Sequence, residues 1–302
     1  MENRQYDVTA LGELLIDFTE NGDSSQGNPT FEANPGGAPC NVLAMLNRLG
    51  KKTAFIGKVG NDMFGKQLKA AVEECGIDTR NLVMDDEIHT TLAFVHTYPD
   101  GDRDFSFYRN PGADMMLTED EVDDTFVQST KIFHFGTLSM THENVRNATK
   151  KAVKAAKKNG SLISFDPNLR EPLWESLEEA KKQMEYGFEQ CDILKISDNE
   201  IQFITGIEDY DQGVLYLQNK YEIPLILLTM GKKGSRAYYK DFRIEEKGFQ
   251  VTFQENMQAA MTADEIVTED LFATIDYNKR VRLEHAKENI AFEHAETQRM
   301  EA

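Results

Sequence analysis

Short apolar runs alternate with longer amphipathic segments over the first ~250 residues, and this alternation predicts repeated strand–helix units. The apolar runs predicted as strands are Val8–Ile16, Lys52–Val59, Lys131–Phe135, Ser161–Asp166, Ile193–Ile196 and Pro224–Leu228. The amphipathic segments predicted as helices are Cys40–Leu49, Phe64–Glu74, Glu143–Lys158, Leu177–Gln190 and Asn199–Thr205. Such units fold into a mostly parallel sheet with helices on both faces, so the expected fold class is α/β.

One region does not follow this rhythm. From Thr91 to Thr97 the odd-numbered side chains face one way and the even-numbered ones the other, which is the period of a strand. A turn over Pro99–Asp102 leads to a returning strand at Phe105–Tyr108, so the pattern predicts a β-hairpin. We expect residues 90–110, together with residues 12–35, to form a small β-sheet lid over the carboxyl edge of the main sheet.

The pattern changes again near residue 250. The last proline is Pro224 and the last glycine is Gly248, and the residues that follow are rich in Glu, Ala, Lys and Arg. Their apolar periodicity is thin. We therefore expect one α/β domain over residues 1–250, and an atypical charged tail, helical or disordered, over residues 251–302.

Composition narrows the class of protein. The chain has 302 residues, 40% of them apolar, with a net charge of -19, which argues against nucleic acid and anionic membranes as partners. A local nest of backbone N–H groups still binds phosphate whatever the global charge. Cys40, Cys75 and Cys191 have no metal-site spacing, and their odd number favours a reducing compartment. With no apolar run of membrane-spanning length and no signal peptide in view, we expect a cytoplasmic protein.

Polar residues follow the predicted strands, where an open α/β sheet binds its ligands. Asp17 ends the first strand, and Gly36 and Gly37 lead through Asn41 into a helix, which allows close backbone approach to a ligand. The ordinary structural alternatives are a turn-forming aspartate and a tight loop.

Three further segments lie at such positions. Arg109–Asp114 follows the hairpin, where a solvated arginine in a surface turn is the structural alternative. Asp166–Arg170 follows a buried strand, and its alternate side chains point the same way in extended backbone, which favours a site. Thr229–Gly234 is a glycine-rich turn after another strand. Alone such a turn is a weak signal, and it gains weight because it follows a strand as the other segments do.

Taken in order, these motifs resemble the ribokinase-like (phosphofructokinase B) family of sugar kinases. Its first signature resembles Asn34–Asn41 (N-P-G-G-A-P-C-N) through Arg48–Gly50, followed by Gly57–Gly65. The segments Arg109–Asp114 and Ser164–Trp174 look like bacterial fructokinases in particular. The resemblance runs from residue 6 to about residue 250. It implies a ribokinase-like three-layer fold with a mostly parallel central sheet, a small β-sheet lid and an atypical C-terminal part.

The resemblance also implies a role for each matching residue. Those expected to bind the sugar, or to lie between it and the phosphates, are Asp17, Gly36, Gly37, Asn41, Arg109, Asp166, Asn168 and Arg170. Those expected on the nucleotide side are Lys195, Ser197, Glu200, Thr229, Gly231 and Gly234, with Glu200 reaching magnesium through water. The implied activity is phosphorylation of D-fructose by ATP with Mg²⁺, the alternative substrate being 2-keto-3-deoxygluconate. A homodimer through the β lid is a further expectation.

One family motif is missing. The second signature, T-G-A-G-D, should lie near residue 255, where its glycines form an anion hole and its aspartate is the base. The chain has a glycine-free stretch there, Thr252–Asp264, so no catalytic base is identified. Glu255 and Asp264 lack the loop that would aim them. Three explanations stay open: an altered reading frame, a catalytically inactive sugar-binding pseudo-kinase, or a tail with a function of its own.

Overall fold

The computed structural model describes residues 4–97, 103–240 and 242–248. The predicted turn at Pro99–Asp102 and the predicted tail over residues 251–302 lie outside the described residues, as do Glu255 and Asp264.

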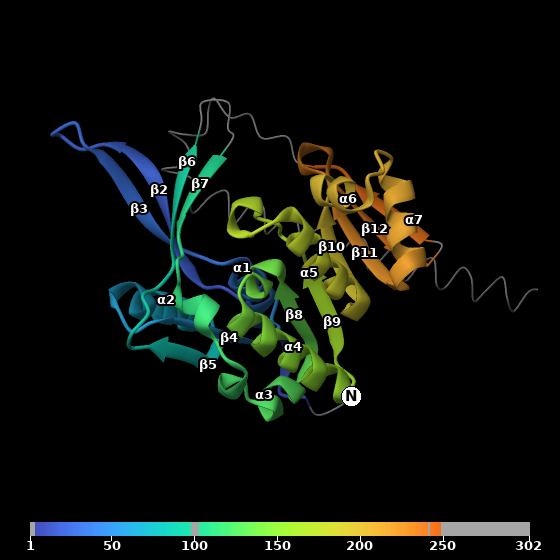
Figure 1. The fold of residues 1–302 in the computed structure, drawn as a ribbon, viewed down its shortest axis with the longest axis horizontal. Helices are drawn as coiled ribbons and strands as arrows, with labels where there is room; N and C mark the ends of the chain where they lie inside the picture. The colour runs from blue at the N-terminus through green and yellow to red at the C-terminus, as the bar shows by residue number, and fades with distance from the viewer. Residues whose placement is uncertain (1–3, 98–102, 241, 249–302) are drawn as a thin grey trace, which may run out of the picture. The chain divides into compact units, whose positions relative to one another are not determined.

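A nine-stranded sheet forms the centre of the described chain, in the order β13-β12-β11-β10-β9-β8-β1-β4-β5 (Figure 1). Its strands are β1 (Tyr6–Leu11), β4 (Thr53–Gly60), β5 (Asp78–Asp85), β8 (Thr130–Gly136), β9 (Leu162–Asp166), β10 (Ile193–Ser197), β11 (Leu225–Thr229), β12 (Ser235–Tyr239) and β13 (Phe242–Glu246). All pairs from β11 to β5 are parallel, and β12 and β13 add antiparallel strands at one edge. The prediction of a mostly parallel sheet is confirmed.

Helices cover both faces of this sheet, and each face has its own hydrophobic core. On one side lie α1 (Ala38–Arg48) and α2 (Met63–Glu74). On the other lie α3 (Asp124–Gln128), α4 (Glu143–Lys158), α5 (Leu177–Gln190), α6 (Asp198–Thr205) and α7 (Tyr210–Tyr221). Short 3₁₀ helices are η1 (Ala113–Met116), η2 (Glu119–Glu121), η3 (Thr137–Met140), η4 (Glu171–Leu173) and η5 (Gly231–Lys233).

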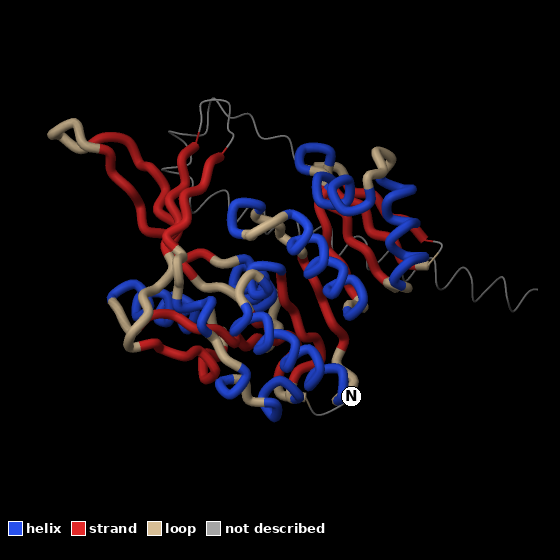
Figure 2. Tube along the Cα trace, in the orientation of Figure 1, coloured by secondary structure: helices blue, strands red, loops and turns tan. Residues whose placement is uncertain are grey.

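The lid is a separate four-stranded sheet in the order β3-β2-β6-β7 (Figure 2). Its strands are β2 (Leu15–Asp23), β3 (Pro29–Gly36), β6 (Leu92–Thr97) and β7 (Arg103–Tyr108). β2 and β6 run parallel, whereas β3 and β7 pair antiparallel with them. The predicted hairpin of β6 and β7 is confirmed.

The prediction of one continuous strand over Val8–Ile16 is wrong. β1 ends at Leu11 and β2 begins at Leu15, so the chain leaves the main sheet between them and enters the lid. Gly12 lies at this exit, where a methyl group would come 2.6 Å from the Pro39 ring. The apolar pattern runs through the exit because the residues on both sides of it are buried.

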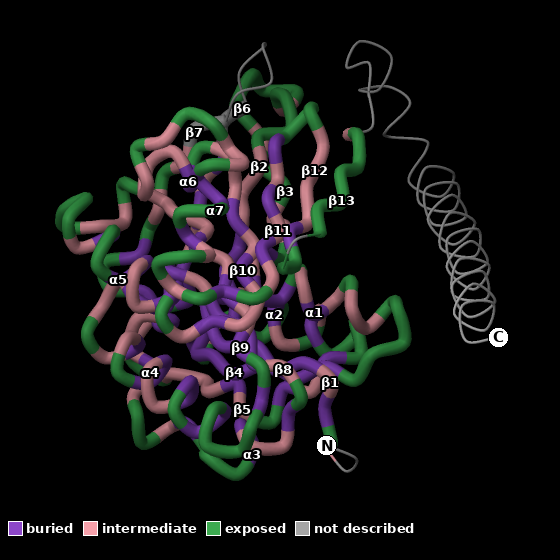
Figure 3. The backbone as a smooth tube through the Cα atoms, turned by 90° about the vertical axis from the view of Figure 1, so that its right-hand side faces the viewer, coloured by how far each residue is buried: buried purple, intermediate pink, exposed green. Residues whose placement is uncertain are grey.

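The two halves of the main sheet differ in burial (Figure 3). Every residue of β4 is buried. In β9, β10 and β11, buried and partly buried residues alternate instead. The partly buried side chains form what we call the half-exposed face: Ser164, Asp166, Ile193, Lys195, Ser197, Leu225, Leu227 and Thr229. The carboxyl-end members of this face are all candidate site residues.

Candidate active site

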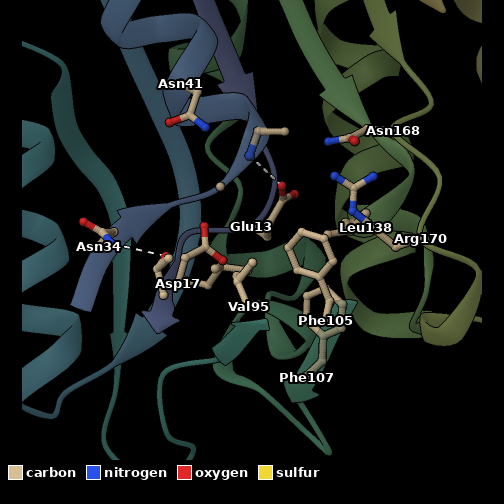
Figure 4. A pocket seen from close by; sticks show the side chains of 14 residues that line it. Glu13, Asp17, Asn34, Asn41, Val95, Phe105, Phe107, Leu138, Asn168 and Arg170 are labelled. Atoms are coloured by element: carbon tan, nitrogen blue, oxygen red, sulfur yellow. Dashed lines mark hydrogen bonds between the residues drawn. The ribbon is translucent and has the colours of Figure 1, made fainter. Parts of the chain in front are cut away.

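A cavity of about 480 Å³ lies between the lid and the carboxyl edge of the main sheet (Figure 4). This volume is typical of small-molecule sites, which span roughly 300–1,000 Å³. Its lining comes from the lid strands, the start of α1, η3 and the segment after β9: Glu13, Leu15, Asp17, Thr19, Asn34, Gly37, Ala38, Asn41, Val95, Phe105, Phe107, Leu138, Asn168 and Arg170.

Asp17 lies in β2 and lines the cavity, as the sequence predicts. Burial raises the pKa of its carboxyl, and the positive charge of Arg170 opposes that rise. Gly36 lies in β3, where it pairs with Leu15 of β2, and it does not line the cavity. A methyl group at Gly36 would lie 2.1 Å from Asp17 Oδ2, so this glycine gives the carboxylate its room. The role of Gly36 in the structure is therefore to support Asp17.

Glu13 was not singled out in the sequence, yet it faces the cavity and is only 3% exposed. Its Oε1 accepts a hydrogen bond of 2.8 Å from the backbone N–H of Ala38. Helix α1 has Gly37 at its N-cap and no capping bond from that residue, so Glu13 supplies the acceptor from another segment. Burial raises the pKa of Glu13 to about 7, against the lowering effect of the backbone N–H groups. A lone carboxylate within the apolar run Ala10–Ile16 was the available signal.

The opposite wall is aromatic and basic. Asn168 and Arg170 follow β9, and Phe105 and Phe107 come from β7. The Arg170 guanidinium lies 5.7 Å from the centre of the Phe105 ring, a cation–π arrangement. Asn168 adopts a positive φ of 43°, which turns the chain sharply after the strand. Sequence reasoning identified the two polar residues, but it assigned the two phenylalanines only to a strand.

Arg109 does not line the cavity. Its side chain is 2% exposed and forms a salt bridge of 2.6 Å with Asp114. The remaining guanidinium N–H groups donate to Thr141 Oγ1 at 2.9 Å and to the Leu138 carbonyl at 3.0 Å. The structural alternative, a solvated arginine in a surface turn, is excluded because the Arg109 side chain is buried.

Asp166 lies beside the main cavity. It lines a small pocket that also includes Glu13, His134 and Asn168. The Lys195 ammonium lies 3.1 Å from Asp166 Oδ2. Burial raises the pKa of Asp166 to about 6, Lys195 opposes the rise, and Glu200 adds to it. Burial and then Lys195 lower the pKa of His134 to about 4, so this histidine is neutral near pH 7.

Glu200 connects the start of α6 to the segment after β9. Its Oε2 accepts hydrogen bonds from the backbone N–H and hydroxyl of Ser197, which form a capping box at the start of α6. Its Oε1 accepts a 2.8 Å bond from the Leu169 N–H, between Asn168 and Arg170. Both carboxylate oxygens of Glu200 already accept hydrogen bonds from the protein. This arrangement fits a contact with a metal ion through water better than direct coordination.

Thr229 ends β11 and pairs with Ser197 of β10, so the two hydroxyl residues lie side by side at the edge. Gly231 and Gly234 have positive φ values of 52° and 100°. A methyl group at Gly234 would lie 2.0 Å from the Glu246 carbonyl oxygen of β13. The close approach of β13 therefore accounts for this glycine without any ligand.

The sheet order brings Lys195, Ser197, Glu200 and Thr229 to one edge, next to Asp166. Across the part of the chain that the structure describes, no group of three His, Cys, Asp or Glu side chains is arranged to hold a metal ion. Within that same part, none of the helices is long and apolar enough to span a membrane.

Comparison with known proteins agrees with this geometry. A family model described as pfkB family carbohydrate kinase matches residues 5–255. Probable fructokinase-2 of Arabidopsis thaliana is 43% identical over 246 residues, which cover 81% of this chain and 75% of the relative.

Solved structures give the same result. The crystal structure of fructokinase from Xylella fastidiosa has a TM-score of 0.75 at 30% identity, covering 82% of this chain and 76% of that one. A structure of fructokinase with bound ATP from Xylella fastidiosa gives 0.73 at 30% identity, with the same coverage. The ribokinase-like fold implied by the sequence motifs is confirmed, and the chain belongs to the pfkB family of carbohydrate kinases.

Proposed function

We propose that this chain is an ATP-dependent sugar kinase of the fructokinase type, with fructose bound in the cavity under the lid. The observation that carries the proposal is the lining of that cavity. Asp17, Asn41 and Asn168 offer acceptors and donors for sugar hydroxyls, and Phe105 and Phe107 offer ring faces for the C–H side of a sugar. The relatives from Arabidopsis thaliana and Xylella fastidiosa are named fructokinases.

The charges in the cavity support a neutral sugar. The charged side chains in its lining are Glu13, Asp17 and Arg170, two carboxyl groups against one guanidinium. Arg109, which would suit an acidic sugar, is paired with Asp114 away from the cavity. A sugar carboxylate would lie near Asp17 and the partly ionised Glu13, which disfavours binding. This argues for fructose over 2-keto-3-deoxygluconate.

For the nucleotide, we place ATP and Mg²⁺ at the adjoining edge, with Lys195, Ser197, Glu200, Thr229, Gly231 and Gly234. The ATP-bound structure of the Xylella relative supports this. The position of Lys195, 3.1 Å from Asp166, would let an ammonium face a phosphate chain beside the sugar. Magnesium, when bound, neutralises the charge that develops on the phosphates. Glu200 would hold it through water, since its own oxygens already accept protein hydrogen bonds.

A second function, sugar binding without turnover, is favoured by one specific observation. The T-G-A-G-D signature, with its anion hole and base, is absent from the sequence.

We assign the kinase domain to residues 1–250, with the lid from 12–35 and 90–110, and the tail to residues 251–302. Location in the cytoplasm stays a prediction.

A homodimer through the lid is a further part of the proposal. Phe94 stacks with Phe18 at 4.9 Å and meets Phe31 and Tyr108 edge-on. Phe31 is 43% exposed and Tyr108 67% exposed. An exposed aromatic cluster of this kind fits contact with a second lid.

One assay separates the two functions. Fructose-dependent release of ADP from magnesium-ATP is measured alongside fructose binding by calorimetry. Turnover of about 1 per second, usual for kinases, establishes the kinase. Fructose binding with no ADP release establishes the sugar-binding protein. A broad, low melting transition that fructose does not shift would reject both.

A further inference from the structure

The base of hairpin β6–β7 is held by one carboxylate. Thr91 comes directly before β6 and Arg109 directly after β7. The Thr91 hydroxyl donates to Asp114 Oδ1, and Arg109 Nε donates to Asp114 Oδ2 at 2.8 Å. The side chains of Arg109 and Asp114 are each 2% exposed. Asp114 thus binds both ends of the hairpin to η1, outside the lid.

The surrounding chain is shaped for this contact. A methyl group at Gly112 would lie 1.8 Å from Thr91 Oγ1 and 2.8 Å from Asp114 Oδ1. Arg109 also donates to Thr141 Oγ1 and to the Leu138 carbonyl, at η3 of the main domain. The polar side-chain atoms of Arg109 and Asp114 therefore all have hydrogen-bond partners, which is what a buried charge requires.

The other lid hairpin, β2–β3, has a similar arrangement. Glu13 precedes β2 and Ala38 follows β3, and the Glu13 carboxyl accepts the Ala38 N–H at 2.8 Å. Ile16 N–H also donates to the Thr91 carbonyl at 3.2 Å, which joins the two hairpin bases. Each lid hairpin is therefore closed at its base by a buried carboxyl group.

Hairpin β6–β7 carries one wall of the cavity. Val95, Phe105 and Phe107 line it, and Phe105 packs under Arg170. In the same sheet, Ala93 pairs with Asp17. A change in the angle of the hairpin base would move the aromatic wall and Asp17 together, because paired strands move as a unit.

We propose that Asp114, with Thr91 and Arg109, is a positioning group for sugar binding, which fixes hairpin β6–β7 over the cavity without touching the sugar. Its effect on sugar affinity rests on the proposed function, whereas its effect on the lid does not.

The test uses Thr91→Val and Thr91→Ser in the full chain. Valine keeps the shape and the Arg109–Asp114 pair but removes the O–H donor, whereas serine restores it. Thr79→Val, which removes a hydroxyl that donates to the Glu73 carboxylate away from the lid, is the matched control. Amide hydrogen exchange of β6 and β7 is measured without sugar, and the fructose dissociation constant by calorimetry.

We expect Thr91→Val to raise exchange in β6 and β7 about tenfold and to weaken fructose binding about fivefold. Thr91→Ser and Thr79→Val should stay within about twofold of the natural chain in both measurements. Unchanged lid exchange in Thr91→Val would overturn the proposal, as would a serine variant that behaves like valine. If the natural chain binds no fructose, the proposed function fails, and the exchange result still decides whether Asp114 fixes the lid.

Discussion

The two halves of the central sheet place different demands on their side chains. β4 is buried along its whole length, between the cores of α1 and α2 and of the helices opposite. β10 and β11 bury alternate residues against one core and keep the others partly exposed. The cavity adjoins the first half through α1 and the lid and takes a second wall from the segment after β9. Of the residues proposed for the nucleotide, Lys195, Ser197 and Thr229 lie on the half-exposed face of the second half. Affinity for the two substrates should therefore respond to separate sets of residues.

The largest expected effect tests the difference in burial. Phe55 in β4 is fully buried, so Phe55→Ala should lower the free energy of unfolding by about 3–5 kcal/mol. Leu227 lies on the half-exposed face of β11, so Leu227→Ala should lower the free energy of unfolding by less than about 1 kcal/mol. Urea denaturation of both variants checks this. Equal losses would show that the second face of β11 is covered as fully as the first.

The second prediction concerns pH. The folded-state pKa of Glu13 lies near 7, above its ordinary value, so its contribution to stability is full at low pH and is lost as pH rises towards 7. Glu13→Gln keeps an acceptor for Ala38 and removes the titration. The difference in unfolding free energy, variant minus natural chain, should grow by up to about 3 kcal/mol from pH 4.5 to pH 8. Thermal melts across this range measure it, and a flat difference contradicts it.

Third, Asp17→Asn should separate the two ligands. Loss of a charged acceptor for sugar hydroxyls costs about 1.5–3 kcal/mol, so fructose affinity should fall about 10- to 100-fold. ATP affinity should not change. Asp23→Asn, at the exposed end of the same strand, is the matched control. Calorimetry with each ligand gives the answer, and an equal loss of both affinities would argue against separate sites.

The smallest expected effect is the converse. Lys195→Met removes the cation beside Asp166 and should weaken ATP binding about tenfold, with fructose affinity within about twofold. Lys220→Met, whose amine pairs with Glu185 away from the edge, controls for loss of a lysine. A Lys195 variant with normal ATP affinity would remove this residue from the nucleotide site.

The amphipathic helices were the easiest elements to predict. The predicted bounds Glu143–Lys158 and Leu177–Gln190 are those of α4 and α5, because a clear helical period begins after a capping residue in each. The strand pattern failed where strands are not buried on a defined face. β13 is exposed throughout, and β3 is largely polar, so neither has a hydrophobic signature.

The residues of the candidate site also divide into those with a local sequence signal and those without one. Asp17, Gly37, Asn41, Asn168 and Arg170 were predicted and do line the cavity. Asn168 and Arg170 follow β9 at the carboxyl edge of the main sheet, whereas the other three come from β2 and from the start of α1. The cavity roles of Glu13 and the two phenylalanines were missed. Their position depends on how the lid packs over the main sheet, and the local sequence pattern does not specify that orientation.

The sequence by itself determined the family, the parallel sheet and the glycines at the start of α1, since these depend on local period and on backbone freedom. Only the tertiary structure decided that Arg109 pairs with Asp114, that Glu13 caps helix α1, and that one half of the sheet keeps a half-exposed face. Burial, pairing of charges and the direction of a side chain are set by segments far apart in the chain, which meet only when it is folded.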